Sequence, residues 1–131
     1  MNDLTFVLRV VDLLASHGLR TWVSGGWGEE LRGLCAPRVH ADVDLLYPAP
    51  DFSRLDALEL DWIAMKRLPH KRAFAVDGIV VEVLLVARDE QGWHTGAYRW
   101  PANVFASAGR LPVASADALS GYRAARLRRA A

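Results

Sequence analysis

The feature that most constrains the fold is a glycine pair that separates a β-prone segment from a helical one. Leu19–Ser24 is short and β-prone, and Gly25-Gly26 follows it directly. Trp27–Leu34 then has the pattern of a helix with Glu29 and Glu30 in its first turn, where acidic side chains stabilise the positive end of the helix dipole. The sequence therefore predicts a unit of strand, glycine turn and helix.

The remaining segments alternate between helical and strand patterns. Leu4–Leu14 has apolar residues at three- and four-residue steps, which predicts an amphipathic helix that ends near His17-Gly18. Asp77-Gly78 is a typical hairpin turn, and Arg88–Gly109 is predicted to be a loop with one short helical or strand segment. Strands are expected at Asp42–Tyr47, Trp62–Arg67, Arg72–Val76 and Ile79–Ala87, and helices at Asp51–Leu58 and Ala116–Ala130. This order favours an α+β fold with an antiparallel or mixed sheet flanked by helices.

Composition indicates a single folded domain over residues 1–131. Hydrophobic residues make up 52% and charged residues 24% of the 131, which is ordinary for a protein with a core. The net charge of +1 is too small for a protein that binds nucleic acid through its phosphates. Cys35 is the single cysteine, so no intramolecular disulfide forms, and no apolar run is long enough to span a membrane. We expect a cytoplasmic protein.

Two aspartates are the first candidates for chemistry. Asp42 and Asp44 lie two apart on a predicted strand, so both carboxylates project from one face while Val43 and Leu45 point into the core. Such hard oxygen ligands bind Mg²⁺ together with substrate phosphates. The alternative is that the two acids are solvated or paired with Arg38.

A third carboxylate, Glu82, interrupts the apolar strand Ile79–Ala87. A carboxylate there is costly unless it is paired, metal-bound or at a cleft. On a neighbouring strand, Glu82 would complete the metal cluster or act as the general base for an acceptor hydroxyl. The alternative is a surface-facing residue on an edge strand.

The glycine pair is a candidate phosphate site. Without side chains, Gly25 and Gly26 let the backbone approach a ligand, and free amides at a helix start attract phosphate. Ser24 adds a hydroxyl donor. Taken alone, however, a glycine pair is more typical of a tight turn that requires positive φ.

Other polar and aromatic residues have ordinary structural explanations. His40 either orients an aspartate or contacts a phosphate, but a histidine before a strand more often makes a structural hydrogen bond. His70–Arg72 favours a charged hairpin over a phosphate clamp. The arginines at the end of the last helix suit the helix dipole, and loop aromatics more often cover the core than stack on a base or drug ring. These residues are Arg123, Arg126, Arg128 and Arg129, and Trp93, Tyr98 and Trp100.

Two motifs together resemble a known family. Trp22–Gly28 reads WVSGGWG and Arg38–Leu45 reads RVHADVDL, a combination similar to the lincosamide and aminoglycoside nucleotidyltransferases of the polymerase-beta superfamily. The likeness spans about residues 4–87, and residues 115–127 match the closing helix more loosely. The resemblance implies a nucleotidyltransferase fold that moves a nucleoside monophosphate from a triphosphate to a hydroxyl of a small, antibiotic-like acceptor, with Mg²⁺ as cofactor and release of pyrophosphate.

The resemblance also implies roles for individual residues. Ser24, Gly25 and Gly26 would hold the triphosphate, with Arg38 and His40 as further nucleotide-binding residues. Asp42, Asp44 and Glu82 would hold two Mg²⁺ ions when the triphosphate is bound. Glu30 falls where the family has an acid after the glycine turn, and it joins Trp93 and Tyr98 as a candidate substrate residue. Ser24 and Glu82 depart from the family pattern, which has Asp at both positions.

Two other functions stay open because of these departures. The first is a degenerate member of the fold that binds a nucleotide or a partner protein without catalysis. The second is a minimal nucleotidyltransferase that modifies a partner protein or tRNA. Relatives carry an extra helical domain around the acceptor, so a homodimer or the 88–109 loop would have to form that wall here.

Overall fold

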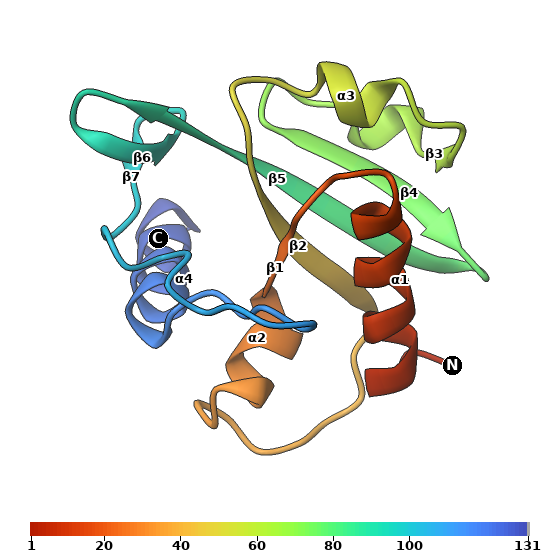
Figure 1. The fold of residues 1–131 in the computed structure, drawn as a ribbon. Helices are drawn as coiled ribbons and strands as arrows, with labels where there is room; N and C mark the ends of the chain where they lie inside the picture. The colour runs from red at the N-terminus through yellow and green to blue at the C-terminus, as the bar shows by residue number, and fades with distance from the viewer. Residues whose placement is uncertain (131) are drawn as a thin grey trace.

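The computed structural model describes residues 1–130, in which helices and strands alternate along the chain (Figure 1). The helices are α1 (Leu4–Ser16), α2 (Gly25–Leu31), α3 (Ser53–Asp56) and α4 (Ala116–Ala130), with a short 3-10 helix over Ala64–Lys66. The strands are β1 (Trp22–Ser24), β2 (Asp42–Pro48), β3 (Asp61–Trp62), β4 (Lys71–Val76), β5 (Ile79–Asp89), β6 (Gly92–Thr95) and β7 (Tyr98–Arg99).

Over residues 1–130, the strands form a seven-stranded mixed sheet. The main path runs β1-β2-β5-β4-β3, and the hairpin β6-β7 continues from the far end of β5. Strands β2 and β5 are parallel, whereas the other pairs are antiparallel. The predicted α+β fold with a mixed sheet flanked by helices is therefore confirmed.

One face of the sheet packs against α1. The side chain of Asp3 caps this helix by accepting a hydrogen bond from the Phe6 backbone nitrogen at 2.9 Å. The apolar side of α1 then meets the alternate residues of β2, β4 and β5 that point to the same face. This first core contains Val7, Val10, Leu14, Val23, Val43, Leu45, Phe74, Val81 and Val83, each 1% exposed or less.

The opposite face packs partly against α4 and the segment that precedes it. Trp22, Leu46 and Val86 of the sheet form a second core with side chains of that segment and of α4. The backbone nitrogen of Val23 donates to Pro112, and Ala114 donates back to Val23, both at 2.9 Å. This pairing fixes the start of α4 beside β1.

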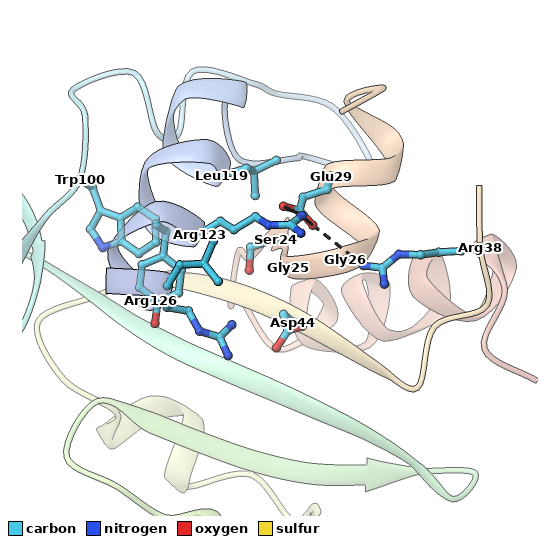
Figure 2. Close-up of a pocket in the computed structure, with 12 residues that line it drawn as sticks. Ser24, Gly25, Gly26, Glu29, Arg38, Asp44, Trp100, Leu119, Arg123 and Arg126 are labelled. Atoms are coloured by element: carbon cyan, nitrogen blue, oxygen red, sulfur yellow. Dashed lines mark hydrogen bonds and ion pairs between the residues drawn. The ribbon is translucent and has the colours of Figure 1, made fainter. Parts of the chain in front are cut away.

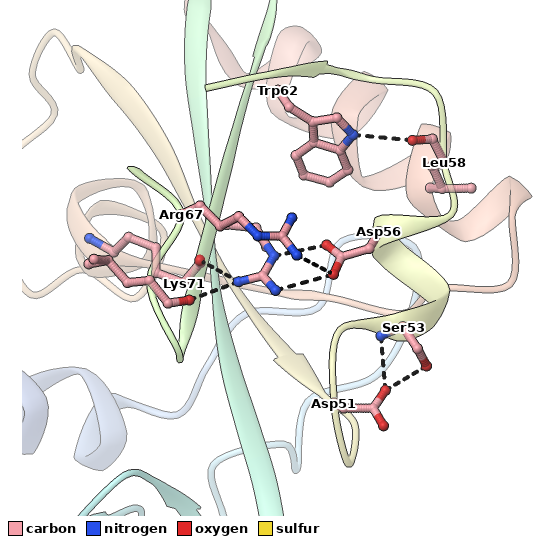
Figure 3. A network of polar contacts seen from close by, with 9 residues as sticks. Asp51, Ser53, Asp56, Leu58, Trp62, Arg67 and Lys71 are labelled. Atoms are coloured by element: carbon pink, nitrogen blue, oxygen red, sulfur yellow. Dashed lines mark hydrogen bonds and ion pairs between the residues drawn. The ribbon is translucent and has the colours of Figure 1, made fainter. Parts of the chain in front are cut away.

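The predicted strand Trp62–Arg67 is wrong beyond its first residue. Only Asp61 and Trp62 pair with β4, and the chain then turns into the 3-10 helix Ala64–Lys66. A polar network shown in Figure 3 explains the turn, because Arg67 and Arg72 both donate to the carboxylate of Asp56, at 3.3 and 2.8 Å. The hydrogen bond from Arg72 lowers the pKa of Asp56 and ties α3 to β4.

The segment Arg88–Gly109 is more ordered than a loop with one short element. Strand β5 runs on to Asp89, and β6 and β7 form a hairpin from it. Glycines with φ of +111° and +56°, Gly92 and Gly96, allow the two turns. The ion pair between Arg99 and Asp89 at 2.6 Å holds the hairpin.

Helix α2 also differs from its predicted bounds. It begins at Gly25, so the glycine pair forms its first turn instead of preceding it. It ends at Leu31, because Gly33 has a φ of +70° and the nitrogens of Gly33 and Leu34 bond back to Glu30 and Glu29. Within the described residues, no helix has both the length and the apolar character required to cross a membrane.

The core should depend strongly on Phe74, which is 0% exposed and packs edge-on against Trp62 with ring centroids 5.7 Å apart. We expect Phe74→Ala to lower the free energy of unfolding by about 3–5 kcal/mol through lost burial and a cavity. Urea unfolding followed by circular dichroism measures the change. Val39→Ala, at a side chain that is 95% exposed, is the control and should change the free energy by less than about 0.5 kcal/mol.

Candidate functional site

Three polar side chains lie in one row across neighbouring strands. In the antiparallel pair β1-β2, Ser24 lies opposite Asp44, and in the parallel pair β2-β5, Asp44 lies opposite Glu82. Residues at opposed positions share a face of the sheet, so the row lies on the face beside the second core. Asp42 is two residues before Asp44 on the same face, and Val43 and Leu45 are fully buried on the other.

The three carboxylates form a compact cluster. Asp42, Asp44 and Glu82 each offer one oxygen, and these oxygens all lie within 4.8 Å of one another. Burial raises the pKa of Asp44 to about 7, and the negative charges of Asp42 and Glu82 add to this rise. In the absence of a cation, the cluster therefore retains a proton near neutral pH.

Glu82 is held by two lysines. Strand β5 lies between β2 and β4, so Glu82 is not on an edge strand and that alternative is wrong. Its two oxygens lie 2.9 Å from the Lys66 amine and 3.6 Å from the Lys71 amine. Burial alone would raise the pKa of Glu82, but the hydrogen bond from Lys66 and the charge of Lys71 outweigh it and lower the pKa.

The glycine turn lies against the aspartates. Gly25 has a φ of +58°, and a Cβ atom there would overlap the carboxylate of Asp44. The position therefore requires glycine both for its backbone conformation and for space. Ser24, at the start of α2, makes no side-chain capping hydrogen bond, so its hydroxyl is available to the adjoining pocket.

His40 and Glu30 belong to a structural network beside the turn. Glu30 Oε1 lies 2.9 Å from His40 Nε2 and accepts a hydrogen bond from the Arg38 backbone nitrogen at 2.9 Å. The bond from Arg38, and then the bond from His40, lower the pKa of Glu30. His40 is buried and its ring lies 4.3 Å from that of Trp27. This arrangement agrees with the alternative prediction that His40 makes a structural hydrogen bond.

Asn2 joins α2 to the start of β2. Its amide donates to the carbonyl oxygens of His40 and Asp42, both at 3.0 Å. Its oxygen accepts a hydrogen bond from the indole of Trp27 at 3.0 Å. The glycine turn and Asp42 are thereby held in fixed relation.

A pocket of about 370 Å³ opens above the turn, between α2, β2 and α4. In Figure 2, Arg123 extends from α4 over the turn to Glu29, while Arg126 extends from α4 toward the side of Asp44. Arg123 pairs with Glu29 at 3.0 Å, and the Arg38 guanidinium lies 3.9 Å from the same carboxylate. Arg38 therefore pairs with Glu29. The alternative prediction, in which Arg38 pairs with Asp42 and Asp44, is wrong in this respect.

The predicted aromatic residues form a cluster beside this pocket. Tyr98 packs edge-on against Trp100 with centroids 4.9 Å apart, and Trp100 stacks on Tyr122 at 4.9 Å. Trp93 packs edge-on against Phe105 at 5.0 Å. Trp100 lines the pocket, while Trp93 and Tyr98 pack against the second core and Tyr98 also lines a groove beside the hairpin β6-β7. A substrate role for Trp93 and Tyr98 stays a prediction.

Sequence reasoning missed several residues around the carboxylates. The sequence pattern predicts a strand at Lys66, so the approach of this side chain to Glu82 has no sequence signal. Lys71 was considered only as part of a charged hairpin, although its position two residues before Ala73, the partner of Glu82 on β4, places it on the same face. In the sequence, Arg126 has an ordinary explanation at the end of a helix, and the packing of α4 brings it to the site.

Comparisons with known proteins find a family and two similar solved structures. The family model described as aminoglycoside-2''-adenylyltransferase matches residues 6–118. The crystal structure of ANT(2'')-Ia in complex with adenylyl-2''-tobramycin is similar, with 16% identity and a TM-score of 0.68 over 93% of this chain and 76% of that chain. A comparison with curated protein sequences finds no match.

A second solved structure, the solution structure of the antibiotic-resistance factor ANT(2'')-Ia, has 19% identity and a TM-score of 0.59. That match covers 89% of this chain and 64% of the other, so this chain spans less than two thirds of it. At such identities, the structural likeness establishes the fold. Because the family model matches most of its length, the chain belongs to the aminoglycoside-2''-adenylyltransferase family and is a nucleotidyltransferase.

Proposed function

We propose that this chain transfers a nucleoside monophosphate from a nucleoside triphosphate to a hydroxyl group of a small acceptor, with a divalent metal ion. The observation that carries the proposal is the juxtaposition of the three-carboxylate cluster with the glycine turn, where Gly25 lies directly against Asp44. A phosphate held at the turn would lie next to the metal ligands. Membership of the family supports the same reaction class.

The carboxylate cluster fits a magnesium site. Asp42, Asp44 and Glu82 supply hard oxygen ligands from within 4.8 Å of one another, and Mg²⁺ prefers a few carboxylates together with substrate phosphates. Bound Mg²⁺ ions would neutralise the triphosphate and stabilise the attacking and leaving oxygens of a displacement at phosphorus. A raised pKa of Asp44 is also the expected signature of acids gathered for a cation.

The pocket beside the turn suits the triphosphate. The backbone of Gly25 and Gly26 lines this pocket, and Ser24 offers its hydroxyl. Arg38, Arg123 and Arg126 line the same pocket and would complement the phosphate charges. In this arrangement, His40 acts indirectly by holding the loop that carries Arg38.

Glu82 is the proposed general base. Lys66 and Lys71 keep it ionised, because they lower its pKa, so it can accept the proton of an acceptor hydroxyl. The acceptor oxygen then forms a bond to the α-phosphorus, the bond from that phosphorus to the bridging oxygen breaks, and pyrophosphate leaves. The nucleotide ends on the acceptor oxygen and the proton on Glu82.

The comparisons suggest the first substrates to test. The family is described as an adenylyltransferase that acts at a 2'' position of aminoglycosides, and the similar crystal structure holds adenylyl-2''-tobramycin. ATP with an aminoglycoside is therefore the reference pair, and pyrophosphate release with Mg²⁺ is the readout. Tight metal-dependent binding of ATP without turnover of any acceptor would instead favour a degenerate, binding-only member of the fold.

The metal cluster can be tested before any acceptor is known. We expect ATP to bind more tightly with Mg²⁺ than without it, and Asp42→Asn to weaken the Mg²⁺-dependent binding by about tenfold or more, since even outer-shell changes have effects of this size. Isothermal titration calorimetry measures both. Asp77→Asn is the control, because this hairpin residue has a φ of +50° that asparagine tolerates. Equal affinity with and without Mg²⁺ in the unaltered protein would contradict the proposal.

The contact between the turn and Asp44 gives a second prediction. We expect Gly25→Ala to reduce nucleotide transfer by about 10²-fold, because the added methyl group displaces a ligand carboxylate and displacements near 1 Å have this effect. Gly33→Ala is the matched control: Gly33 also has a positive φ, of +70°, but a Cβ there meets nothing within 4 Å. If both variants lose activity equally, backbone strain causes the loss, and the contact between Gly25 and Asp44 does not.

The raised pKa of Asp44 predicts a pH-dependent stability without metal. The folded protein holds a proton on Asp44 up to about pH 7, whereas the unfolded chain releases it near its ordinary value of 3.8. The free energy of unfolding should therefore fall as pH rises from about 4 to 7. At pH 8, Asp44→Asn should be more stable than the unaltered protein by about 1–4 kcal/mol, since each pKa unit corresponds to about 1.4 kcal/mol.

Urea unfolding in metal-free buffer at pH 4 and pH 8 measures this difference. Asp61→Asn, which removes an exposed carboxylate away from the site, should keep the original pH profile. Saturating Mg²⁺ at pH 8 should stabilise the unaltered protein and leave Asp44→Asn unchanged. A difference between the two proteins that does not vary with pH would show that Asp44 is not the protonated group.

A further inference from the structure

One side of helix α4 forms a wall of the pocket above the glycine turn. The α4 residues that line this pocket follow one another at steps of three, one, three and one positions, so they share one side of the helix. They are Leu119, Tyr122, Arg123, Arg126 and Leu127. Leu127 is 63% exposed, and exposed apolar surface gathered at a pocket is typical of a ligand-binding groove.

Helix α2 holds α4 in this position. A Cβ atom at Gly28 would lie 3.1 Å from the Leu119 side chain, so the last glycine of the glycine-rich motif allows the two helices to approach closely. At the end of α2, Arg32 donates hydrogen bonds to the carbonyl oxygens of Val113 and Ala114, at 2.8 and 3.0 Å, just before α4 begins. The wall is therefore part of the folded protein before any ligand binds.

The pocket has a polar side and an apolar side. The polar side consists of the glycine turn, Asp44 and Arg38, which the proposed function gives to the triphosphate and its metal ions. The apolar side consists of Trp100, Leu119, Tyr122 and Leu127, which together we call the apolar wall. Figure 2 shows Trp100 and Arg38 at opposite ends of the view. One ligand with a charged part and a flat apolar part can contact both sides.

Two aromatic rings of the apolar wall are held in place. Trp100 stacks on Tyr122 with 22° between the ring planes and centroids 4.9 Å apart. The indole nitrogen of Trp100 donates to the Thr95 hydroxyl at 2.8 Å, and that hydroxyl donates to the Leu85 carbonyl oxygen at 2.7 Å. The Arg126 guanidinium lies 5.9 Å from the centre of the Tyr122 ring, so a cation proposed for the phosphates adjoins the rings. Rings fixed in this way bind a flat ligand at little cost in side-chain entropy.

The nucleoside of the triphosphate is the group that reaches this wall. It is bonded to the α-phosphate, so a triphosphate bound at the glycine turn leaves it in the same pocket of about 370 Å³. The acceptor hydroxyl must instead lie within hydrogen-bonding reach of Glu82, the proposed base, and Glu82 is not among the described residues that line this pocket. Nucleobases are flat and stack on aromatic side chains.

We propose that the apolar wall binds the nucleobase of the nucleoside triphosphate and favours a purine over a pyrimidine. The base lies against Tyr122 and Leu127, while Trp100 supports the Tyr122 ring by stacking on it. A purine has two fused rings, so it covers more of the wall than a pyrimidine and gains more from burial. This inference rests on the proposed nucleotide transfer and specifies the nucleotide class of the same site.

Three ligands separate the base from the phosphates. ATP, CTP and inorganic tripolyphosphate each carry a triphosphate chain, with a purine, a pyrimidine and no base. With Mg²⁺, isothermal titration calorimetry should give ATP an affinity about threefold or more above that of CTP, since the larger base buries and stacks more surface. Tripolyphosphate reports on the polar side of the pocket alone.

Two variants of the apolar wall locate the effect. Tyr122→Leu keeps an apolar side chain but removes the ring, and it should lower the ratio of ATP affinity to tripolyphosphate affinity by about tenfold, within the range for one base stacked on an aromatic side chain. Leu127→Ser should lower the same ratio by about threefold through lost apolar contact. Neither variant should change the affinity for tripolyphosphate, which also shows that the variant is folded.

Ala124→Ser is the matched control. It also places a serine on the exposed surface of α4, but Ala124 is not among the described residues that line the pocket. The ratio of ATP affinity to tripolyphosphate affinity should therefore keep its original value.

The outcomes separate this inference from the proposed function. An unchanged ratio in Tyr122→Leu or in Leu127→Ser, or an ATP affinity no higher than that of CTP, would overturn it. Equal losses of ATP and tripolyphosphate affinity would overturn it as well, because the two residues would then serve the phosphates. In each of these cases, Mg²⁺-dependent binding of tripolyphosphate to the unaltered protein leaves the phosphate site standing. If neither ATP nor tripolyphosphate binds with Mg²⁺, the proposed function is rejected, and this inference with it.

Discussion

The parallel pairing of β2 with β5 is the constraint on which the rest of the site depends. Its register sets Asp44 opposite Glu82, and the antiparallel pairing of β1 with β2 sets Ser24 on the other side of Asp44. A shift by one residue would turn the acids of one strand into the core on the α1 face. The buried residues Val43, Val81 and Val83 on that face therefore fix the positions of the carboxylates. Packing on one face of the sheet and chemistry on the other are specified by the same register.

Local patterns in the sequence were sufficient to predict the strands that carry Ser24, Asp44 and Glu82. The alternation around Asp42 and Asp44 predicted which side chains share a face, and the charge within the apolar strand marked Glu82. The strand, glycine turn and helix were also predicted, although the glycines form the first turn of α2. These features depend on neighbours in sequence, for which periodicity is informative.

What could not be predicted depends on distant contacts. The turn after Trp62 is set by Arg67 and Arg72, which converge on Asp56 from other elements. The pairing of Glu30 with His40 and the approach of Lys66 to Glu82 likewise need the folded chain. The pocket above the glycine turn combines residues of α2, β2 and α4, which lie far apart in the sequence.

The contact between Gly25 and Asp44 restricts substitutions at some positions of the carboxylate cluster more than at others. Because no Cβ fits between them, these two positions are coupled: a side chain at 25 or a longer acid at 44 would push into the other. Glu82 lies on the neighbouring strand β5, opposite the small side chain of Ala73 on β4. A longer acid therefore conflicts with the glycine turn at position 44, whereas the glutamate of this cluster stands at position 82.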